Sequence, residues 1–259
     1  MLVVIGRLGP VRVTLAYAVI LTSVTSVLLW QGPEFKDRVV CHASTNLHNL
    51  SHGRLGTLVG SAFVVDAGPI YVWLPGLICL LALAELQWGS VRLLVVFAVG
   101  HVGATLLVAA ALGAGVAQAW LPGSVAHAPD VGMSYGAAAV LGSLTAALPA
   151  RWRPAWIGWW LAIGFATLAI ERGFSDVGHV AALTLGMLAS ARFAREGRWT
   201  SVRWLLLGVA VAFGYALLVT SGPSATIATA CGLVAAASGL VVARLRRRWA
   251  FEGQLAHRL

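Results

Sequence analysis

Charged residues are scarce in this sequence: they make up only 10% of its 259 residues. A soluble domain carries about 25% charged residues, whereas 59% of this chain is hydrophobic. A chain this apolar cannot cover its nonpolar surface in water, and it must satisfy its backbone polar groups internally. We therefore exclude a soluble globular fold and predict an all-α fold, a polytopic bundle of membrane helices.

Cysteine and acidic residues are also few. Cys41, Cys79 and Cys231 are odd in number and fall in unrelated segments, so no disulfide framework is expected. Only 9 acidic residues oppose 18 basic ones, which gives a formal net charge of +9. The basic residues lie between apolar segments and not in one patch interleaved with aromatic residues. We therefore expect the lipid bilayer as a partner, and no nucleic acid.

The hydrophobic pattern predicts transmembrane helices. About 20 apolar residues cross a bilayer, and about eight stretches of the chain reach this length. They lie near Val11–Trp30, Pro69–Gln87, Val91–Val116, Gly132–Pro149, Ala155–Ile170, Asp176–Ala194, Val202–Thr220 and Ala225–Ala243. We divide the chain into a six-span core of residues 1–194 and a segment of residues 195–259 with two further spans and a basic tail. No cleavable signal peptide is expected, because the first run is long enough to span and lacks a small-x-small site.

The basic residues also predict the orientation. With the N-terminus inside, 14 of them fall in inside segments and only Lys36, Arg38, Arg54 and Arg172 fall outside. The positive-inside rule then predicts a multi-pass protein of the inner (plasma) membrane with both termini in the cytoplasm. Arg244–Arg248 would face anionic lipid at the cytoplasmic surface.

A serine and a histidine draw attention because apolar residues surround both. Ser134 lies in Gly132-Met133-Ser134-Tyr135-Gly136 at the start of one predicted span, and His179 lies near the start of another. Both spans run from outside to inside in the predicted orientation. At a rise of about 1.5 Å per residue, both side chains would lie a few ångströms below the outer surface, at one depth.

Such a pair suits acyl-transfer chemistry. A serine hydroxyl is a poor nucleophile until a neighbouring base takes its proton, and histidine is the usual base near neutral pH. At a helix N-terminus, unpaired N–H groups would stabilise the oxyanion formed from a peptide carbonyl, and Gly132 and Gly136 would allow close approach. The motif alone is weak, since composition predicts about 0.2 chance occurrences of G-x-S-x-G. Small residues in membrane helices also serve close packing.

Other histidines offer alternatives. His101 lies in the middle of the third predicted span, about 15 Å from either surface, and is the rival of His179 as the base. A histidine inside a span can be purely structural, although ionisable groups there are costly and functional by default. The spacing of His48 and His52, near His42, would suit a metal on one helical face. No acidic partner completes such a site, so we expect no metal.

Two aspartates flank the dyad residues in the sequence. Asp130 precedes the span of Ser134, and Asp176 precedes His179 at the start of its span. Helix capping explains both at least as well as orientation of a histidine does.

The order of these segments resembles the rhomboid family of intramembrane serine proteases, over about Val11 to Ala194. Thr57–Phe63 is similar to the end of the family's first outer loop. Leu83–Gly89, followed by Ser90–Leu94, is similar to the acidic turn between the second and third spans. The resemblance implies a six-helix core, to which the last two spans are additions.

The same resemblance assigns roles to the dyad. Gly132-Met133-Ser134 matches the nucleophile motif of the fourth span, and His179 resembles the sixth-span histidine. Ser134 would be the nucleophile, His179 the general base, and Gly132 and Met133 the motif residues beside the oxyanion. Three small residues, Gly136, Ala182 and Gly186, would serve helix packing.

Several positions depart from the family pattern. The second span of the family carries histidine and asparagine, and the matching positions here hold Val65, Ile70 and Leu74. Losing one oxyanion donor costs about 10²–10³ in rate. Tyr135 replaces a glycine, and Ala138 replaces an aromatic residue that supports the histidine. Tyr135 either crowds the site or replaces the lost contact.

Two functions follow from the resemblance, and a third stays open. The first is an intramembrane serine endopeptidase that cleaves transmembrane segments of protein substrates near the outer face without a cofactor. The second is an inactive relative that binds client transmembrane helices and directs their stability or export. A small-solute transporter is disfavoured because only His101 is polar at mid-bilayer.

Overall fold

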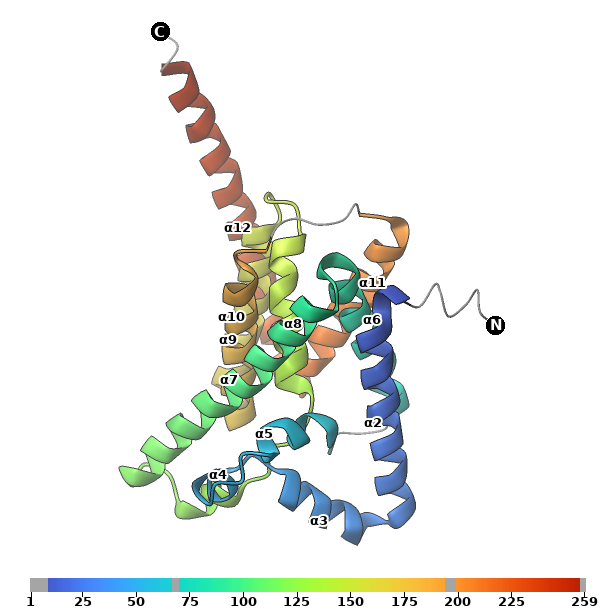
Figure 1. Ribbon diagram of the computed structural model, residues 1–259. Helices are drawn as coiled ribbons and strands as arrows, with labels where there is room; N and C mark the ends of the chain where they lie inside the picture. The colour runs from blue at the N-terminus through green and yellow to red at the C-terminus, as the bar shows by residue number, and fades with distance from the viewer. Residues whose placement is uncertain (1–8, 67–69, 194–198, 257–259) are drawn as a thin grey trace.

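The computed structural model describes residues 9–66, 70–193 and 199–256, and side chains as far as residue 246. The described residues form helices and connections without a strand, which confirms the all-α prediction. In chain order the elements are η1 (Gly9–Val11), α2 (Arg12–Gln31), α3 (Pro33–Ala43), α4 (Leu47–Ser51), α5 (Thr57–Gly60), η2 (Ser61–Phe63), α6 (Ile70–Trp88), α7 (Ser90–Ala117), η3 (Gly123–His127), α8 (Ser134–Ala147), α9 (Arg153–Glu171), α10 (Phe174–Ser190), α11 (Ser201–Leu218) and α12 (Gly222–Ala256). Figure 1 shows them as one bundle.

Six helical segments are long and apolar enough to cross a membrane, counted over the described residues. They correspond to six of the eight predicted spans. The other two form shorter helices, α8 with 14 residues and α10 with 17. Helix α8 begins only after Gly132, which has a φ of +125°, and it ends before Pro149, because a residue that precedes proline disfavours the helical conformation.

Helix α8 is the centre of the bundle. Every residue from Tyr135 to Ala147 is buried, and α7 and α10 pack along it (Figure 1). Gly142 faces the backbone of Leu183, and Gly186 faces the backbone of Ala139, so closely that a Cβ atom at either glycine would collide. Because neighbouring helices enclose it, α8 does not need the length of a lipid-exposed span.

A buried carboxylate ties α2 to the turn between α6 and α7. Glu85 accepts hydrogen bonds from the N–H groups of Val13 (3.0 Å) and Thr14 (2.9 Å). The hydroxyls of Thr14 (2.7 Å) and Ser90 (2.6 Å) also donate to it. The N-cap residue of α2, Val11, makes no capping hydrogen bond of its own. Glu85 takes over this role at the N-terminus of α2, where the helix dipole favours a negative charge.

The last two long helices pack on the outside of the core. Helix α11 contacts α6, where Gly76 lies against Phe213, and α12 crosses α9, where Gly158 lies against the Ala235 carbonyl. The 35 residues of α12 extend over about 52 Å, well beyond a bilayer core of about 30 Å. Its C-terminal part projects from the bundle (Figure 1). The basic tail predicted there begins with exposed Arg244 and Arg246; the side chains of Arg247 and Arg248 lie outside the described residues.

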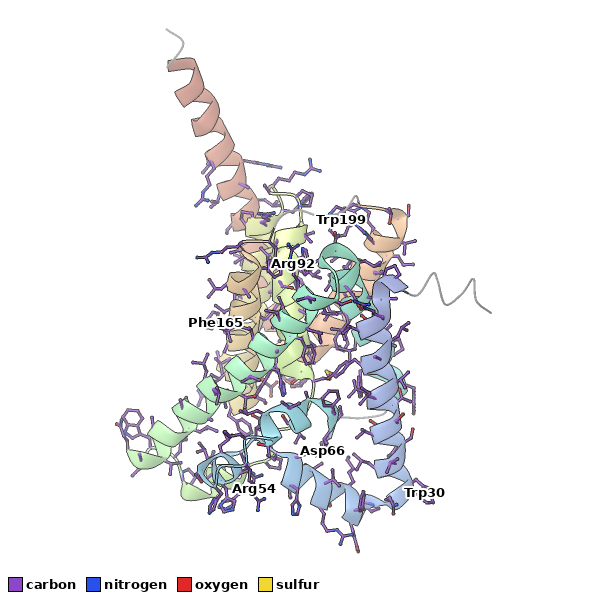
Figure 2. All side chains as sticks on the ribbon, viewed as in Figure 1. Trp30, Arg54, Asp66, Arg92, Phe165 and Trp199 are labelled. Carbon is purple, nitrogen blue, oxygen red and sulfur yellow. The ribbon has the colours of Figure 1, made fainter. Side chains whose placement is uncertain are left out.

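Tryptophans lie toward both ends of the bundle. Trp30 is 83% exposed at the end of α2, while Trp199 lies at the opposite end (Figure 2), where its Nε1 donates to the Ala147 carbonyl at 3.2 Å. Tryptophan is enriched at both membrane–water interfaces. The two positions therefore agree with a bundle that spans a bilayer.

Candidate functional site

Ser134 is the first residue of α8. The turn before it depends on Gly132, whose φ of +125° is a conformation that other residues rarely adopt. The Gly132 N–H donates to the Ser61 carbonyl at 2.9 Å, and the Ala137 N–H donates to the Met133 carbonyl at 2.9 Å. A fixed turn thus presents Ser134 at the helix N-terminus.

The half-buried Ser134 side chain faces a hollow of about 230 Å³. We call this space the Ser134 hollow; it is lined by Val65, Asp66, Pro129, Val131, Gly132, Met133, Ser134 and Leu217. The Ser134 hydroxyl makes no hydrogen bond with a described residue, and no side chain caps α8. The first N–H groups of a helix have no intrahelical acceptor, so those of α8 are available to a ligand in this region.

His179 lies near the N-terminus of α10, at the same end of the bundle as Ser134, and packs against Tyr135. The two rings meet edge to face, with centroids 5.4 Å apart and an interplanar angle of 78°. The Tyr135 ring also covers Gly178, where a side chain would collide with it. His179 Nε2 is buried and has no hydrogen-bond partner. Tyr135, which stands where the family pattern has a glycine, therefore contacts the histidine directly.

The dyad hydrogen bond is not formed in this structure. Ser134 and His179 lie at the same end of two packed helices, as their predicted depths require, but Tyr135 is the residue whose ring contacts His179. His179 is not among the residues that line the Ser134 hollow. A nucleophile–base hydrogen bond would require the two side chains to come closer than they are in this structure.

The other predicted site residues lie in or next to the same two helices, α8 and α10. Met133 is buried beside Ser134, and Gly136 lies under the Phe97 ring of α7, which leaves no space for a side chain. Ala182 is fully buried, and Gly186 packs on the Ala139 backbone. Gly136 and Gly186 thus have the close contacts expected of packing residues.

One of the apolar departures from the family pattern lines the Ser134 hollow. Val65, which stands where a polar residue was expected, is 7% exposed and lines the Ser134 hollow. Beside it, Asp66 also lines the hollow and forms an ion pair with Lys36 at 2.6 Å. Sequence reasoning missed Asp66, whose only signal was its position next to Val65.

A second serine–histidine pair lies nearby. His101 does not contact Ser134; its Nε2 is 3.0 Å from the Ser61 hydroxyl, and both residues are at least 96% buried. Through its carbonyl, Ser61 also holds Gly132. The pair therefore connects α7 to the turn that presents Ser134. No spacing in the sequence signals this pair, because 40 residues separate the two partners.

The two flanking aspartates differ in role. Asp176 accepts a hydrogen bond from the Gly173 N–H at 3.0 Å and so caps α10, as predicted. Asp130 is held by its backbone, which bonds Ser44 and Thr45. Burial raises the pKa of its carboxyl to about 6, although a favourable interaction with the Tyr135 hydroxyl partly opposes this.

The outer-loop histidines form a stack. The ring of His48 lies 4.3 Å from that of His52 and 4.6 Å from that of His127, between centroids. Over the described part of the chain, no group of histidine, cysteine or acidic residues has the geometry to hold a metal ion.

Comparison with known proteins gives one match. Residues 9–196 match the sequence model of the rhomboid-like protein family, whereas no curated protein and no solved structure gives a match. The matched range covers well over half of the chain, including the Ser134 turn and His179. The chain belongs to the rhomboid-like protein family.

Proposed function

We propose that this protein is an intramembrane serine endopeptidase of the rhomboid type, which cleaves transmembrane segments of protein substrates near the outer membrane face. One observation carries the proposal. The packing of Tyr135 on Gly178 and His179 brings a histidine with an unpartnered Nε2 next to the residue that follows Ser134. A nucleophile and a base thus start from neighbouring positions on two packed helices.

The mechanism uses only residues of this chain. Ser134 attacks the scissile carbonyl, and His179 Nε2 takes its proton and gives it to the leaving amine as the C–N bond breaks. A water molecule, deprotonated by His179, then hydrolyses the acyl-enzyme, and His179 returns the proton to Ser134. The unpaired N–H groups at the start of α8, at the positive end of its dipole, stabilise the oxyanion. Both side chains rotate toward each other when substrate fills the Ser134 hollow, since catalytic hydrogen bonds often tighten only in the complex.

A second function is favoured by two other observations. The Ser134–His179 hydrogen bond is absent, and Val65 lines the Ser134 hollow where a polar group would assist the oxyanion. An inactive rhomboid-like protein with these features would bind client transmembrane helices and direct their stability or export.

Labelling with a fluorophosphonate probe separates the two functions, because only an activated serine reacts. We expect the detergent-solubilised wild type to label, and Ser134→Ala and His179→Ala to lose labelling. Ser143→Ala is the matched control, since Ser143 lies on the same helix, is buried and donates to the Val140 carbonyl. Ser61→Ala tests whether the second serine–histidine pair reacts instead.

Two results would overturn the protease proposal. One is an unlabelled but folded wild type beside a labelled intramembrane protease, which would favour the client-binding function. The other is labelling that survives in Ser134→Ala, which would place the reactive serine elsewhere.

A further inference from the structure

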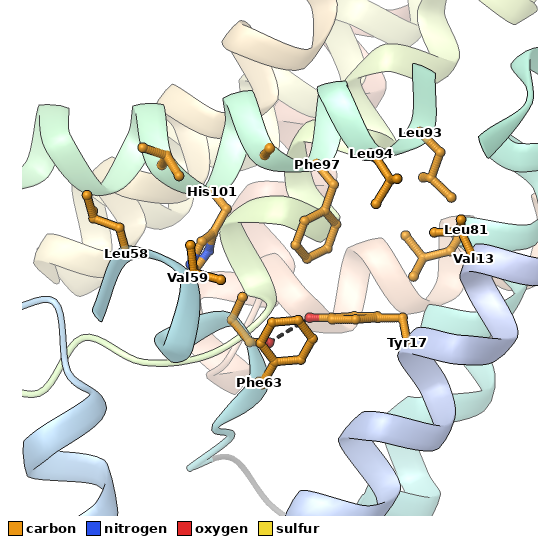
Figure 3. A pocket seen from close by; sticks show the side chains of 13 residues that line it. Val13, Tyr17, Leu58, Val59, Phe63, Leu81, Leu93, Leu94, Phe97 and His101 are labelled. Atoms are coloured by element: carbon orange, nitrogen blue, oxygen red, sulfur yellow. Dashed lines mark hydrogen bonds between the residues drawn. The ribbon is translucent and has the colours of Figure 1, made fainter. Parts of the chain in front are cut away.

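An apolar cavity of about 230 Å³ lies between α2, α5, α6 and α7 (Figure 3). It is separate from the Ser134 hollow, with which it shares no lining residue. Tyr17 of α2, Phe63 of η2 and Phe97 of α7 form one wall. The Tyr17 ring meets the other two edge to face, with centroids 5.3 and 5.2 Å apart.

The polar atoms around the cavity are nearly all satisfied. The Tyr17 hydroxyl donates to the Ala62 carbonyl at 2.6 Å, and His101 Nε2 bonds the Ser61 hydroxyl. His101 Nδ1 is the buried side-chain atom on the wall that lacks a partner. A buried water needs two to four polar partners, so this cavity is not suited to water.

The cavity opens on an apolar surface. Val59 of α5 and Leu94 of α7 line it and are 63% and 52% exposed. On α7 the opening continues into the lipid-facing surface of the span, where Val95 is 50% and Val99 is 40% exposed. The opening therefore meets the bilayer interior, and the molecules there are lipid chains and membrane helices.

Size decides between these two occupants. An engineered apolar cavity of about 150 Å³ stays dry and binds a small hydrocarbon such as benzene. This cavity, at about 230 Å³, is in the same size range, which suits part of a hydrocarbon chain and not a helix with a diameter of about 10 Å. A single hydrocarbon chain is narrow enough to enter the cavity. By filling it, the chain removes the free-energy cost of an empty cavity, which increases with the volume of the cavity.

We infer that this cavity binds one acyl chain of a membrane lipid. The chain enters between Val59 and Leu94 and lies against the aromatic wall, next to His101. The cavity wall is linked to the first turn of α8, because Ser61 bonds His101 and also holds Gly132. The inference does not depend on whether Ser134 is reactive.

Photocrosslinking tests the inference. The full-length protein is reconstituted into phosphatidylcholine vesicles in which part of the lipid carries a diazirine in its acyl chain, and labelled residues are mapped by mass spectrometry. We expect labels on cavity residues such as Tyr17, Phe97 and His101. Ala98→Trp, at a cavity-lining and exposed position, should abolish these labels.

Val99→Trp is the matched control, because Val99 is exposed on the same helix but does not line the cavity. It should retain the labels. Leu94→Trp blocks the same opening and serves if Ala98→Trp does not fold. Equal cavity labelling in the blocking and control variants would overturn the inference, as would labels confined to outward-facing residues in the wild type.

Discussion

At the scale of single residues, Tyr135 distinguishes this site from the family pattern. Its ring contacts His179 and covers Gly178, and the residue is 3% exposed. Its hydroxyl makes no hydrogen bond of ordinary geometry and interacts only with the Asp130 carboxyl. An aromatic ring thus contacts the histidine from position 135, whereas the family pattern has its aromatic residue at position 138. The ring, and not the hydroxyl, makes the contacts that position the histidine.

Substitution of Tyr135 tests whether its ring or its hydroxyl positions the histidine. We expect Tyr135→Phe to keep nearly wild-type thermal stability and probe labelling, because the hydroxyl makes no hydrogen bond of ordinary geometry and loses only its interaction with Asp130. Tyr135→Ala should lower the free energy of unfolding by about 3 kcal/mol, since it removes a buried ring. Thermal unfolding in detergent measures both variants; a large loss in Tyr135→Phe would show that the hydroxyl has a partner.

Asp130 gives the site a pH dependence. Burial raises its pKa from 3.8 to about 6, so between about pH 4 and pH 6 the folded protein holds a proton that the unfolded chain releases. The folded state then loses stability as the pH rises through this interval. The loss is complete above about pH 6 and amounts to at most about 3 kcal/mol.

Asp130→Asn should remove this dependence. We expect the variant to melt at a higher temperature than the wild type at pH 7, and at nearly the same temperature near pH 4, where the wild-type carboxyl is protonated. The backbone hydrogen bonds to Ser44 and Thr45 stay available in the variant. A temperature difference that does not change with pH would contradict the assignment.

At the scale of elements, hydropathy predicted the position of every long helix, but it did not explain why each helix begins and ends where it does. The expected span Gly132–Pro149 became α8 (Ser134–Ala147), because a backbone turn at Gly132 and the proline at 149 limit it. Its short length follows from its central position, which depends on contacts between distant segments. A pattern of apolar residues carries no information on those contacts.

Glycines on two helices give a matched pair of substitutions. A Cβ atom at Gly186 would meet the Ala139 backbone, whereas Gly208 of α11 has no neighbouring heavy atom within 4 Å of that position. Gly186→Ala should destabilise the protein by about 2 kcal/mol or more, since the helices must separate. Gly208→Ala should stabilise it by about 0.5–1 kcal/mol, because alanine is the better helix former.

Thermal melting of both variants checks this pair of predictions. If Gly186→Ala melts at the wild-type temperature, α8 and α10 do not pack as closely as described. If only Gly208→Ala has a lower melting temperature than the wild type, the surroundings of α11 are more crowded than the structure shows.

At the scale of the whole molecule, the sequence indicated the class, the family and the common end of Ser134 and His179. The length of the apolar runs indicated the class, the alternating direction of the spans indicated the common end, and the resemblance of the motif residues indicated the family. The sequence did not indicate the Ser61–His101 pair or the position of Asp66 on the wall of the Ser134 hollow. Both depend on how the connection between α2 and α6 folds back against α7 and α8, which no local pattern encodes.

The orientation of the bundle in the membrane remains a prediction from charge. Arg244 and Arg246 are exposed near the end of α12, whereas η3, which joins α7 to α8, lies at the opposite end of the bundle (Figure 1). The positive-inside rule places the basic end in the cytoplasm. The start of α8, with Ser134, would then lie toward the outer face.

Tags at the two ends test this orientation. In right-side-out vesicles, we expect a C-terminal tag to resist added protease and a tag inserted in η3 to be cleaved. Permeabilised vesicles, in which both tags should be cleaved, control for accessibility. Cleavage of the C-terminal tag alone in intact vesicles would show that the bundle has the opposite orientation. The start of α8, with Ser134, would then lie near the cytoplasmic face.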